Sequence, residues 1–204
     1  MLRIETAIPW KAFNEAGFDI HFATESGKQP ACDERMLSGV TGALLGAAKP
    51  AKDAYQLLQA CEASKNPVSW IDDSFTLETF DLVFLPGGHD KAVRQIIDSE
   101  RVHSLLAAYF PLTKSPSTKG IAAICHGVQV LAASSHADGK SVLADVTTTS
   151  LLHFQEQSIY QATRLFLGDY YKTYGAGTPS VQEIVSEKLT NPVTQFKSSM
   201  LLAP

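Results

Sequence analysis

The sequence predicts an α/β fold in which a doubly wound parallel sheet lies between two layers of helices. Two apolar runs, 81–85 and 120–124, are typical of strands that are buried on both faces. Helical patterns over 51–63, 90–98 and 100–109 alternate with these runs. Strands that alternate with helices form parallel sheets, so these observations together indicate the class.

Turn and helix signals place the remaining elements. An apolar face between Pro9 and Gly17 predicts a first helix, because proline is tolerated in a first turn and glycine ends a helix. Residues 18–23 alternate in polarity like a strand, and residues 24–27 form a turn after it. The second buried strand runs directly into a helix predicted from His126 to Ser134.

Composition excludes several classes of protein. Seventeen basic and 21 acidic side chains leave a net charge of −4, which offers no footprint for nucleic acid or an anionic membrane. No apolar run approaches the ~20 residues of a membrane span, and residues 1–5 do not begin a signal peptide. The cysteines Cys32, Cys61 and Cys125 are far apart, which argues against disulfides or structural zinc and for the cytoplasm. Without a GxGxxG motif, P-loop or metal cluster, we expect no cofactor and no metal.

The strongest functional signal is the segment Ala123-Ile124-Cys125-His126-Gly127. A buried strand ends here and a helix begins at once, a turn that lifts a nucleophile above the sheet and requires small flanking residues. The start of the helix favours a thiolate at Cys125. The alternative is a buried cysteine that acts only as a small hydrophobe.

A second signal is the glycine pair in Leu85-Pro86-Gly87-Gly88-His89. Adjacent glycines can direct N–H groups into a cleft, as an oxyanion hole requires, although they also form ordinary tight turns. Ligands bind beyond the carboxyl ends of parallel strands, so the glycine and cysteine segments support each other.

The segments DLVFLPGGH (81–89) and IAAICHG (121–127) resemble the DJ-1/PfpI (ThiJ) superfamily. ETAIPW (5–10), residues 18–27 and GDYYKTY (168–174) are similar to its Hsp31-like branch, so the resemblance runs over most of the chain. It implies a three-layer sandwich of the flavodoxin-like, class I glutamine amidotransferase-like kind. It also implies a homodimer.

The resemblance implies roles for individual residues. Cys125 matches the family's elbow cysteine, and His126 matches the histidine of a Cys-His-acid arrangement in Hsp31-like members. Glu5 matches the acid ahead of the first helix that, when protonated, donates a hydrogen bond to the cysteine sulfur. From the sequence alone, Glu5 would be an ordinary helix-start acid. Gly87, Gly88 and the His126 N–H match the oxyanion-stabilising amides.

The acid partner of His126 stays open. The family's acid falls near a strand at residues 146–149, where this chain has no acidic residue. Asp145 and Glu156 are close in sequence, and either could lie on the surface. His153 is expected to be a structural histidine.

Other residues carry weaker signals. Asp33 and Glu34 could line a substrate entrance. Structural or surface roles are expected for His21, His103, His136, the turn residues Asp72 and Asp73, and the core residues Trp10 and Trp70.

The chain departs from the family at both ends. Only four residues precede Glu5, too few for the family's first strand, and losing a central strand leaves its neighbours with unpaired backbone groups. After Phe196 there is no counterpart of the closing strand and helix. We therefore expect a single domain over residues 1–204 without these elements, with self-association as one way to supply a strand.

The resemblance implies a glyoxalase III-type lyase that converts methylglyoxal to lactate without glutathione. The Cys125 thiolate would add to the aldehyde, Gly87, Gly88 and the His126 N–H would hold the oxyanion, and Glu5 or His126 would move protons. A hydrolase or hydratase acting on another small metabolite is an alternative with the same residues. The non-enzymatic alternative is a stress chaperone or redox sensor that is oxidised at Cys125.

Overall fold

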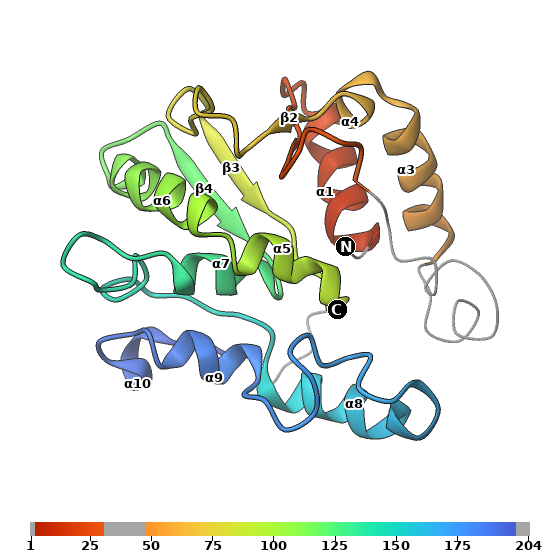
Figure 1. Cartoon of the computed structure of the whole chain (residues 1–204), viewed down its shortest axis with the longest axis vertical. Coiled ribbons are helices and arrows are strands. Elements are labelled where there is room, and N and C mark those ends of the chain that lie inside the picture. Colours follow the sequence, from red (N-terminus) through yellow and green to blue (C-terminus); the bar gives the residue numbers. More distant parts are fainter. Residues whose placement is uncertain (1–2, 31–47, 199–204) are drawn as a thin grey trace.

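The structure is a computed structural model that describes residues 3–30 and 48–198 (Figure 1). Cys32, Asp33 and Glu34 lie outside the described residues. The described elements are α1 (Arg3–Glu15), β1 (Ala23–Thr24), α3 (Lys49–Ala60), α4 (Glu62–Lys65), β2 (Val68–Ser69), β3 (Leu82–Leu85), η2 (Lys91–Val93), α5 (Arg94–Ile97), α6 (Glu100–Tyr109), η3 (Phe110–Thr113), β4 (Gly120–Ala123), α7 (Gly127–Ala133), α8 (His153–Leu167), α9 (Val181–Ser186) and α10 (Pro192–Gln195).

The described strands form two parallel pairs. β1 pairs with β2, with Ala23 opposite Val68. β3 pairs with β4 along its whole length, from Leu82 opposite Gly120 to Leu85 opposite Ala123. Within the described residues each pair is a separate two-stranded sheet. The parallel pairing and the interleaved helices confirm the predicted α/β class.

Helices lie on both sides of β3, as Figure 1 shows for α1 on one side and α5 to α7 on the other. Val83 and Leu85 belong to the main apolar cluster, to which α5, α6 and α7 also contribute. Phe84 points the other way, because side chains alternate along a strand, and its ring centroid lies 5.8 Å from that of Phe13 in α1. β3 therefore lies in the middle layer, with helices packed against both of its faces.

The prediction that residues 120–124 are buried on both faces is wrong for one face. Ala122 is exposed, and Ile124 is 41% exposed. On this side α1 packs through Phe13 against Phe84 of β3, while the exposure of Ala122 and Ile124 shows that β4 is not covered in the same way. An apolar run alone could not reveal which faces its neighbours would cover.

The first helix begins earlier than predicted, at Arg3 rather than Pro9, and Pro9 lies inside it. Proline has no N–H and so cannot donate to the carbonyl of Glu5, four residues before it. The helix is stabilised instead by packing: Ala7 is fully buried against residues of α3, including Ala54 and Leu58. Glu5 therefore lies in the first turn of α1 and not ahead of the helix.

Two predicted strands are largely irregular. Of residues 18–23 only Ala23 enters a strand, and residues 146–149 contribute a single parallel bridge between Thr148 and Phe196. A strand forms where a neighbour supplies hydrogen bonds along its length, and alternating polarity does not guarantee such a neighbour.

The predicted helices are present with small shifts at their ends. The helix expected over 51–63 ends at Ala60, and the one expected over 90–98 is divided into η2 and α5. α6 begins after Ser99, whose hydroxyl accepts a hydrogen bond from the Val102 N–H. Across 3–30 and 48–198, none of the helices combines the length and apolar character needed to cross a membrane.

Candidate functional site

Cys125 lies in a strained turn between β4 and α7. Its φ of 54° is the one positive value of a non-glycine residue in the described chain. Such a backbone persists only where its surroundings enforce it, and it is common at functional sites. The turn is closed by the Gly127 N–H, which donates to the Ile124 carbonyl at 2.8 Å. The predicted elbow is therefore present.

Two glycines allow the end of β3 to approach this turn. A Cβ on Gly127 would collide with the carbonyl oxygens of Leu85 and Pro86. A Cβ on Gly87 would collide with the Glu5 carboxyl and would lie 2.8 Å from the Cys125 Cβ. Both positions need glycine because neighbouring atoms occupy the space of a side chain. The expected proximity of the two segments is observed.

The Cys125 thiol is mostly enclosed, and this decides its acidity. Burial raises the pKa of the thiol well above its usual range, and Glu5 raises it further. The backbone N–H groups of His126 and Gly88 face the sulfur and act in the opposite direction. The expectation that the helix start would produce a thiolate is wrong here, because the loss of solvation outweighs these N–H groups.

Glu5 faces this thiol from the first turn of α1. Burial raises the pKa of its carboxyl, while contacts with the Cys125 thiol and the Gly87 N–H lower it to a smaller extent. Its Oε2 atom is buried without a well-formed hydrogen bond to the described residues. Glu5 is thus arranged to hold a proton next to the sulfur.

His126 directly follows Cys125 and is 1% exposed. Its Nδ1 lies 3.3 Å from the Cys125 Sγ, and its buried Nε2 has no partner among the described residues. Burial lowers the pKa of the ring to about 4; Glu156 acts to raise this pKa and Lys172 to lower it. The ring is therefore neutral at pH 7, with a lone pair available for a proton, but the lowered pKa makes it a weak base.

Asp145 and Glu156, the two candidate acid partners of His126, differ in their surroundings. Glu156 is buried in α8 and influences the ring, whereas Asp145 accepts a hydrogen bond from Thr190 at an exposed position. Glu156 is not free, however. Its Oε1 lies 2.8 Å from the Lys172 Nζ, and its Oε2 accepts from the Val181 N–H at 2.9 Å.

Lys172 is the residue that the sequence did not point to. A lysine between a tyrosine and a threonine would ordinarily be placed at the surface, yet the Lys172 side chain is 2% exposed. The available signal was its place within residues 168–174, which already carried part of the family resemblance.

The same segment packs against the glycine turn. His89, directly after Gly88, is buried between Tyr170 and Tyr171, with ring centroids at 4.7 and 4.3 Å. The Thr173 hydroxyl donates to the His89 carbonyl at 2.9 Å. Residues 170–173 therefore support the turn that presents the Gly88 N–H.

The remaining sequence candidates lie away from Cys125 and have local partners. The contacts are His153 Nδ1 with Ser180 at 3.1 Å, His103 with the Ile97 carbonyl at 2.7 Å, His21 with Asp19 at 3.2 Å, the His136 N–H with the Lys140 carbonyl at 2.9 Å, and Asp72 with Ser74 at 2.6 Å. Trp70 belongs to the main cluster and Trp10 packs against the second, as expected.

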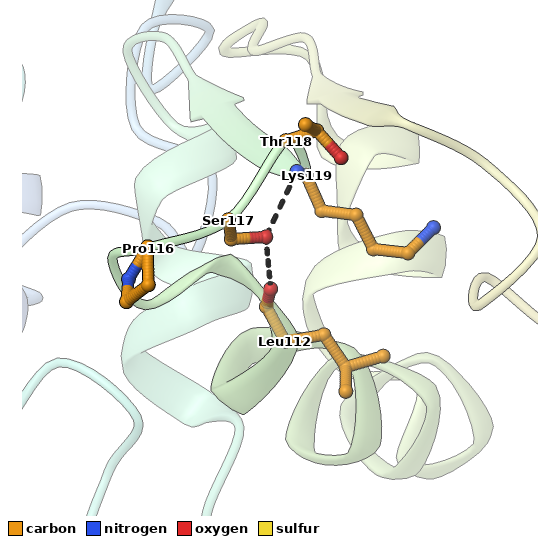
Figure 2. Close-up of a pocket in the computed structure, with 5 residues that line it drawn as sticks. All are labelled: Leu112, Pro116, Ser117, Thr118 and Lys119. Carbon is orange, nitrogen blue, oxygen red and sulfur yellow. Dashed lines mark hydrogen bonds between the residues drawn. The ribbon is translucent and has the colours of Figure 1, made fainter.

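A pocket of about 640 Å³ lies far from the elbow, at the start of β4 (Figure 2). The Ser117 hydroxyl donates to the Leu112 carbonyl at 2.6 Å and accepts from the Lys119 N–H at 3.0 Å. Ligands of parallel sheets bind at the opposite end of the strands, where Cys125 lies. Over the described ranges, no three His, Cys, Asp or Glu side chains are grouped to hold a metal ion.

Comparisons with known proteins agree with this arrangement. A family profile described as ThiJ/PfpI family-like matches residues 2–199. The chain is 38% identical over 154 residues to the uncharacterized protein C14C4.04 of Schizosaccharomyces pombe, which covers 74% of this chain and 55% of that protein. The chain thus spans about half the length of this relative.

Two solved structures share the fold. The crystallographic structure of APC35852 has a TM-score of 0.64 at 21% identity, over 97% of this chain and 73% of that one. The Rapid Encystment Protein 24 kDa of Francisella tularensis has a TM-score of 0.63 at 17% identity, over 99% and 76%. With the profile matching nearly the whole chain and a cysteine elbow at the ends of its parallel strands, the protein belongs to the ThiJ/PfpI-like family.

Proposed function

We propose that the protein is a cysteine-dependent lyase of the glyoxalase III type, which converts methylglyoxal to lactate without glutathione. The observation that carries the proposal is the placement of Cys125 between a proton-holding carboxyl, Glu5, and a neutral imidazole, His126. Carbonyl addition needs a nucleophile, a base for its proton and a donor for the oxyanion, and each has a candidate here.

In the first step, the Cys125 sulfur adds to the aldehyde carbon and its proton passes to His126 Nδ1, 3.3 Å away. The carbonyl π electrons move to oxygen, and the N–H groups of Gly88 and His126, which face the sulfur, would stabilise the oxyanion. Return of the proton from His126 to this oxygen gives a neutral hemithioacetal. Nothing is oxidised or reduced in this addition.

In the second step, the hydrogen on the former aldehyde carbon is removed as a proton and an enediol forms. Glu5 or His126 would carry out this transfer, since these groups flank the sulfur. Protonation of the neighbouring carbon leaves a thioester, and water then displaces the Cys125 thiol to release lactate. One molecule of water is consumed, so the atoms balance.

The Hsp31-like branch is part of the proposal. Members of that branch would pair the histidine with an acid, and Glu156 is the carboxylate that influences the His126 ring. Glu156 forms an ion pair with Lys172, so this site differs from a simple Cys-His-acid arrangement.

The test is lactate formation from methylglyoxal with glutathione omitted. The wild type should form lactate and Cys125→Ser should not. Cys61→Ser is the matched control, because Cys61 lies at the end of α3 and is not part of the site. A folded wild type that forms no lactate would refute the glyoxalase proposal and direct attention to hydrolase or hydratase substrates.

The raised pKa of the Cys125 thiol slows oxidation and carbonyl addition alike, because both reactions proceed through the thiolate, so this pKa does not discriminate turnover from redox sensing. Mass spectrometry after mild peroxide treatment compares the two functions. Rapid and selective oxidation of Cys125 without lactate formation would support the sensor.

A further inference from the structure

The segment GDYYKTY, residues 168–174, has no part in the chemistry proposed above, although it carries part of the family resemblance. In the structure it packs against His89, the residue directly after Gly88, and the contact between Thr173 and His89 joins positions 84 residues apart. Bringing such distant parts of a chain together costs conformational entropy. The contacts of this segment with the end of the glycine turn therefore call for an explanation.

An ion pair, a hydrogen bond and a cation–π contact fasten both ends of the segment. Near its start, the Asp169 Oδ2 lies 3.0 Å from the Lys91 Nζ of η2. At its end, the Tyr174 hydroxyl donates to Asp98, and the Arg94 guanidinium of α5 lies 4.9 Å from the centroid of the Tyr174 ring. Both ends are thereby attached to the part of the chain that leads away from the glycine turn.

The centre of the segment holds His89 by its ring and by its backbone. The ring packs against those of Tyr170 and Tyr171, and all three residues are buried. The His89 carbonyl accepts a hydrogen bond of 2.9 Å from the hydroxyl of Thr173, which is 4% exposed. A hydrogen bond that is shielded from water in this way is stronger than one in solvent. The side chain and the carbonyl of His89 are therefore both fixed.

Lys172 attaches the same segment to α8. Its side chain is 2% exposed, and its Nζ lies 2.8 Å from the Oε1 of Glu156, which is also buried. The residues on either side of Lys172, Tyr171 and Thr173, contact His89 instead. The segment is therefore held between α8 and the end of the glycine turn, and it can transmit the rigidity of the helix to the turn.

The glycine turn needs such support because its own residues do little to restrict it. Gly88 has a φ of 132°, which residues with a side chain rarely adopt, and glycine loses more conformational freedom on folding than any other residue. The turn is close to the nucleophile, since a Cβ on Gly87 would lie 2.8 Å from the Cys125 Cβ. An amide that stabilises an oxyanion must be fixed before the reaction, because reorienting it during the reaction costs free energy.

We propose that Thr173 is a positioning residue for the oxyanion site. Through the His89 carbonyl it fixes the glycine turn, and the turn then presents the Gly88 N–H to the sulfur of Cys125. The inference rests on the proposed function in taking the Gly88 N–H as an oxyanion donor. It holds for any carbonyl substrate of Cys125, because addition of the sulfur places negative charge on the same oxygen in each case.

The test compares Thr173→Val, which keeps the shape of threonine but removes the hydroxyl, with Thr173→Ser, which keeps the donor. NMR relaxation of the backbone amides, measured without substrate, reports the motion of Gly88. We expect an order parameter of about 0.85 at this amide in the wild type and a fall toward about 0.6 in Thr173→Val. The Gly127 amide in the elbow should be unchanged, and Thr173→Ser should behave as the wild type.

A second readout separates kcat from KM in the lactate assay. Complete loss of one oxyanion donor lowers kcat by about 100- to 1,000-fold. A loosened donor is only partly lost, so Thr173→Val should lower kcat by about tenfold with little change in KM. Thr173→Ser should restore kcat. A variant that lost only stability would not show this division between kcat and KM.

Thr178→Val is the matched control. The Thr178 hydroxyl donates to the Gly175 carbonyl at 2.8 Å, so this substitution removes the same kind of hydrogen bond at a position outside the glycine turn. It should leave the Gly88 amide and kcat unchanged, and urea denaturation measures the stability lost by each variant. The proposal is wrong if the two valine variants loosen Gly88 equally, or if Thr173→Val loses stability while Gly88 stays rigid.

The wild type also tests the proposal, which matters if Thr173→Val does not fold. A Gly88 amide as mobile as that of Gly139, an exposed turn residue, would show that the turn is not fixed in advance and would overturn the inference.

The relaxation measurement needs no substrate, so it is independent of turnover. Loosening of Gly88 by Thr173→Val in a protein that forms no lactate would refute the proposed function and support the role of Thr173. Lactate formation together with a rigid Gly88 in this variant would do the reverse.

Discussion

Glu5 and Glu156 are two carboxyl groups withdrawn from solvent, one beside Cys125 and the other beside Lys172, but their surroundings differ. Burial dominates at Glu5 and raises the pKa of its carboxyl. Glu156 instead meets a lysine ammonium and a backbone N–H at hydrogen-bond distance. Two carboxyl groups in unlike environments can take different tasks in one site. Here Glu5 can carry a proton, while Glu156 is a charged group that Lys172 holds in place.

The largest expected effect is a difference in unfolding free energy between the variants Glu156→Gln and Glu5→Gln. Glu156→Gln leaves the Lys172 ammonium buried without its counter-charge, and we expect a loss of about 3–5 kcal/mol in the free energy of unfolding. Glu5→Gln keeps the shape of a group that the fold favours in its neutral form, so its unfolding free energy at pH 7 should stay the same or rise. Urea denaturation measures both. Equal losses in the two variants would mean that the contrast drawn above is wrong.

The next largest effect is a loss of stability at low pH that is caused by protonation of His126. Its pKa falls from 6.5 to about 4 on folding. Protonation therefore favours the unfolded state, and the stabilisation present above pH 6.5 is lost as the pH falls toward 4. Integrated over this window the loss is about 3 kcal/mol.

Urea denaturation at a series of pH values tests this prediction, with His126→Gln as the control that lacks the titrating ring. A wild-type curve parallel to that of the variant from pH 6.5 to 4 would contradict the buried neutral histidine. Glu5 contributes with the opposite sign: its pKa is raised on folding, so its stabilisation is present at low pH and is lost as the pH rises.

Gly87→Ala should disturb the Glu5 side of the site at moderate cost. The added Cβ would overlap the Glu5 carboxyl and approach the Ile124 carbonyl oxygen to 2.6 Å, so we expect a loss of about 1–3 kcal/mol and displacement of Glu5. The readouts are unfolding free energy and the pH profile of Cys125 alkylation. Gly120→Ala is the matched control in the next strand, because its Cβ would meet only Leu82, at 3.5 Å. If both substitutions have the same effect, close packing at Gly87 is not what positions Glu5.

The smallest effect is expected at His153, which also contacts a carboxylate but at the surface. His153 and Glu183 are 47% and 50% exposed at their side chains. His153→Gln should change the unfolding free energy by less than about 1 kcal/mol and leave Cys125 alkylation unaltered. The lowered pKa of Glu183, about 2, arises first from the Ser180 N–H, which the substitution retains. A change in Cys125 alkylation would connect this contact to the site, contrary to the separation described here.

Local signals in the sequence were enough to predict the elbow. Gly127 is needed because the carbonyl groups at the end of β3 occupy the space of its side chain, and Cys125 takes a positive φ for the same tight turn. Such requirements arise within a few residues, so they leave a readable pattern. The parallel class followed equally from the spacing of apolar runs and helices.

The partners of the elbow could not be predicted in this way. Glu156 lies 16 residues before Lys172, and the two side chains meet only when the segment after α8 folds back against that helix. The burial of Lys172 depends on that carboxylate, and neither residue alone differs from a surface charge. The acidity of Cys125 was also missed, because solvation depends on every segment that covers the sulfur.

Pro9 has a consequence for the motion of α1. Because it cannot donate to the Glu5 carbonyl, the first turn is attached to the rest of the helix by one hydrogen bond fewer than usual. A helix end with fewer bonds unravels at a lower free energy than the whole protein unfolds. The segment that covers the thiol can therefore fray by itself, which gives Cys125 a route to solvent that does not require global unfolding.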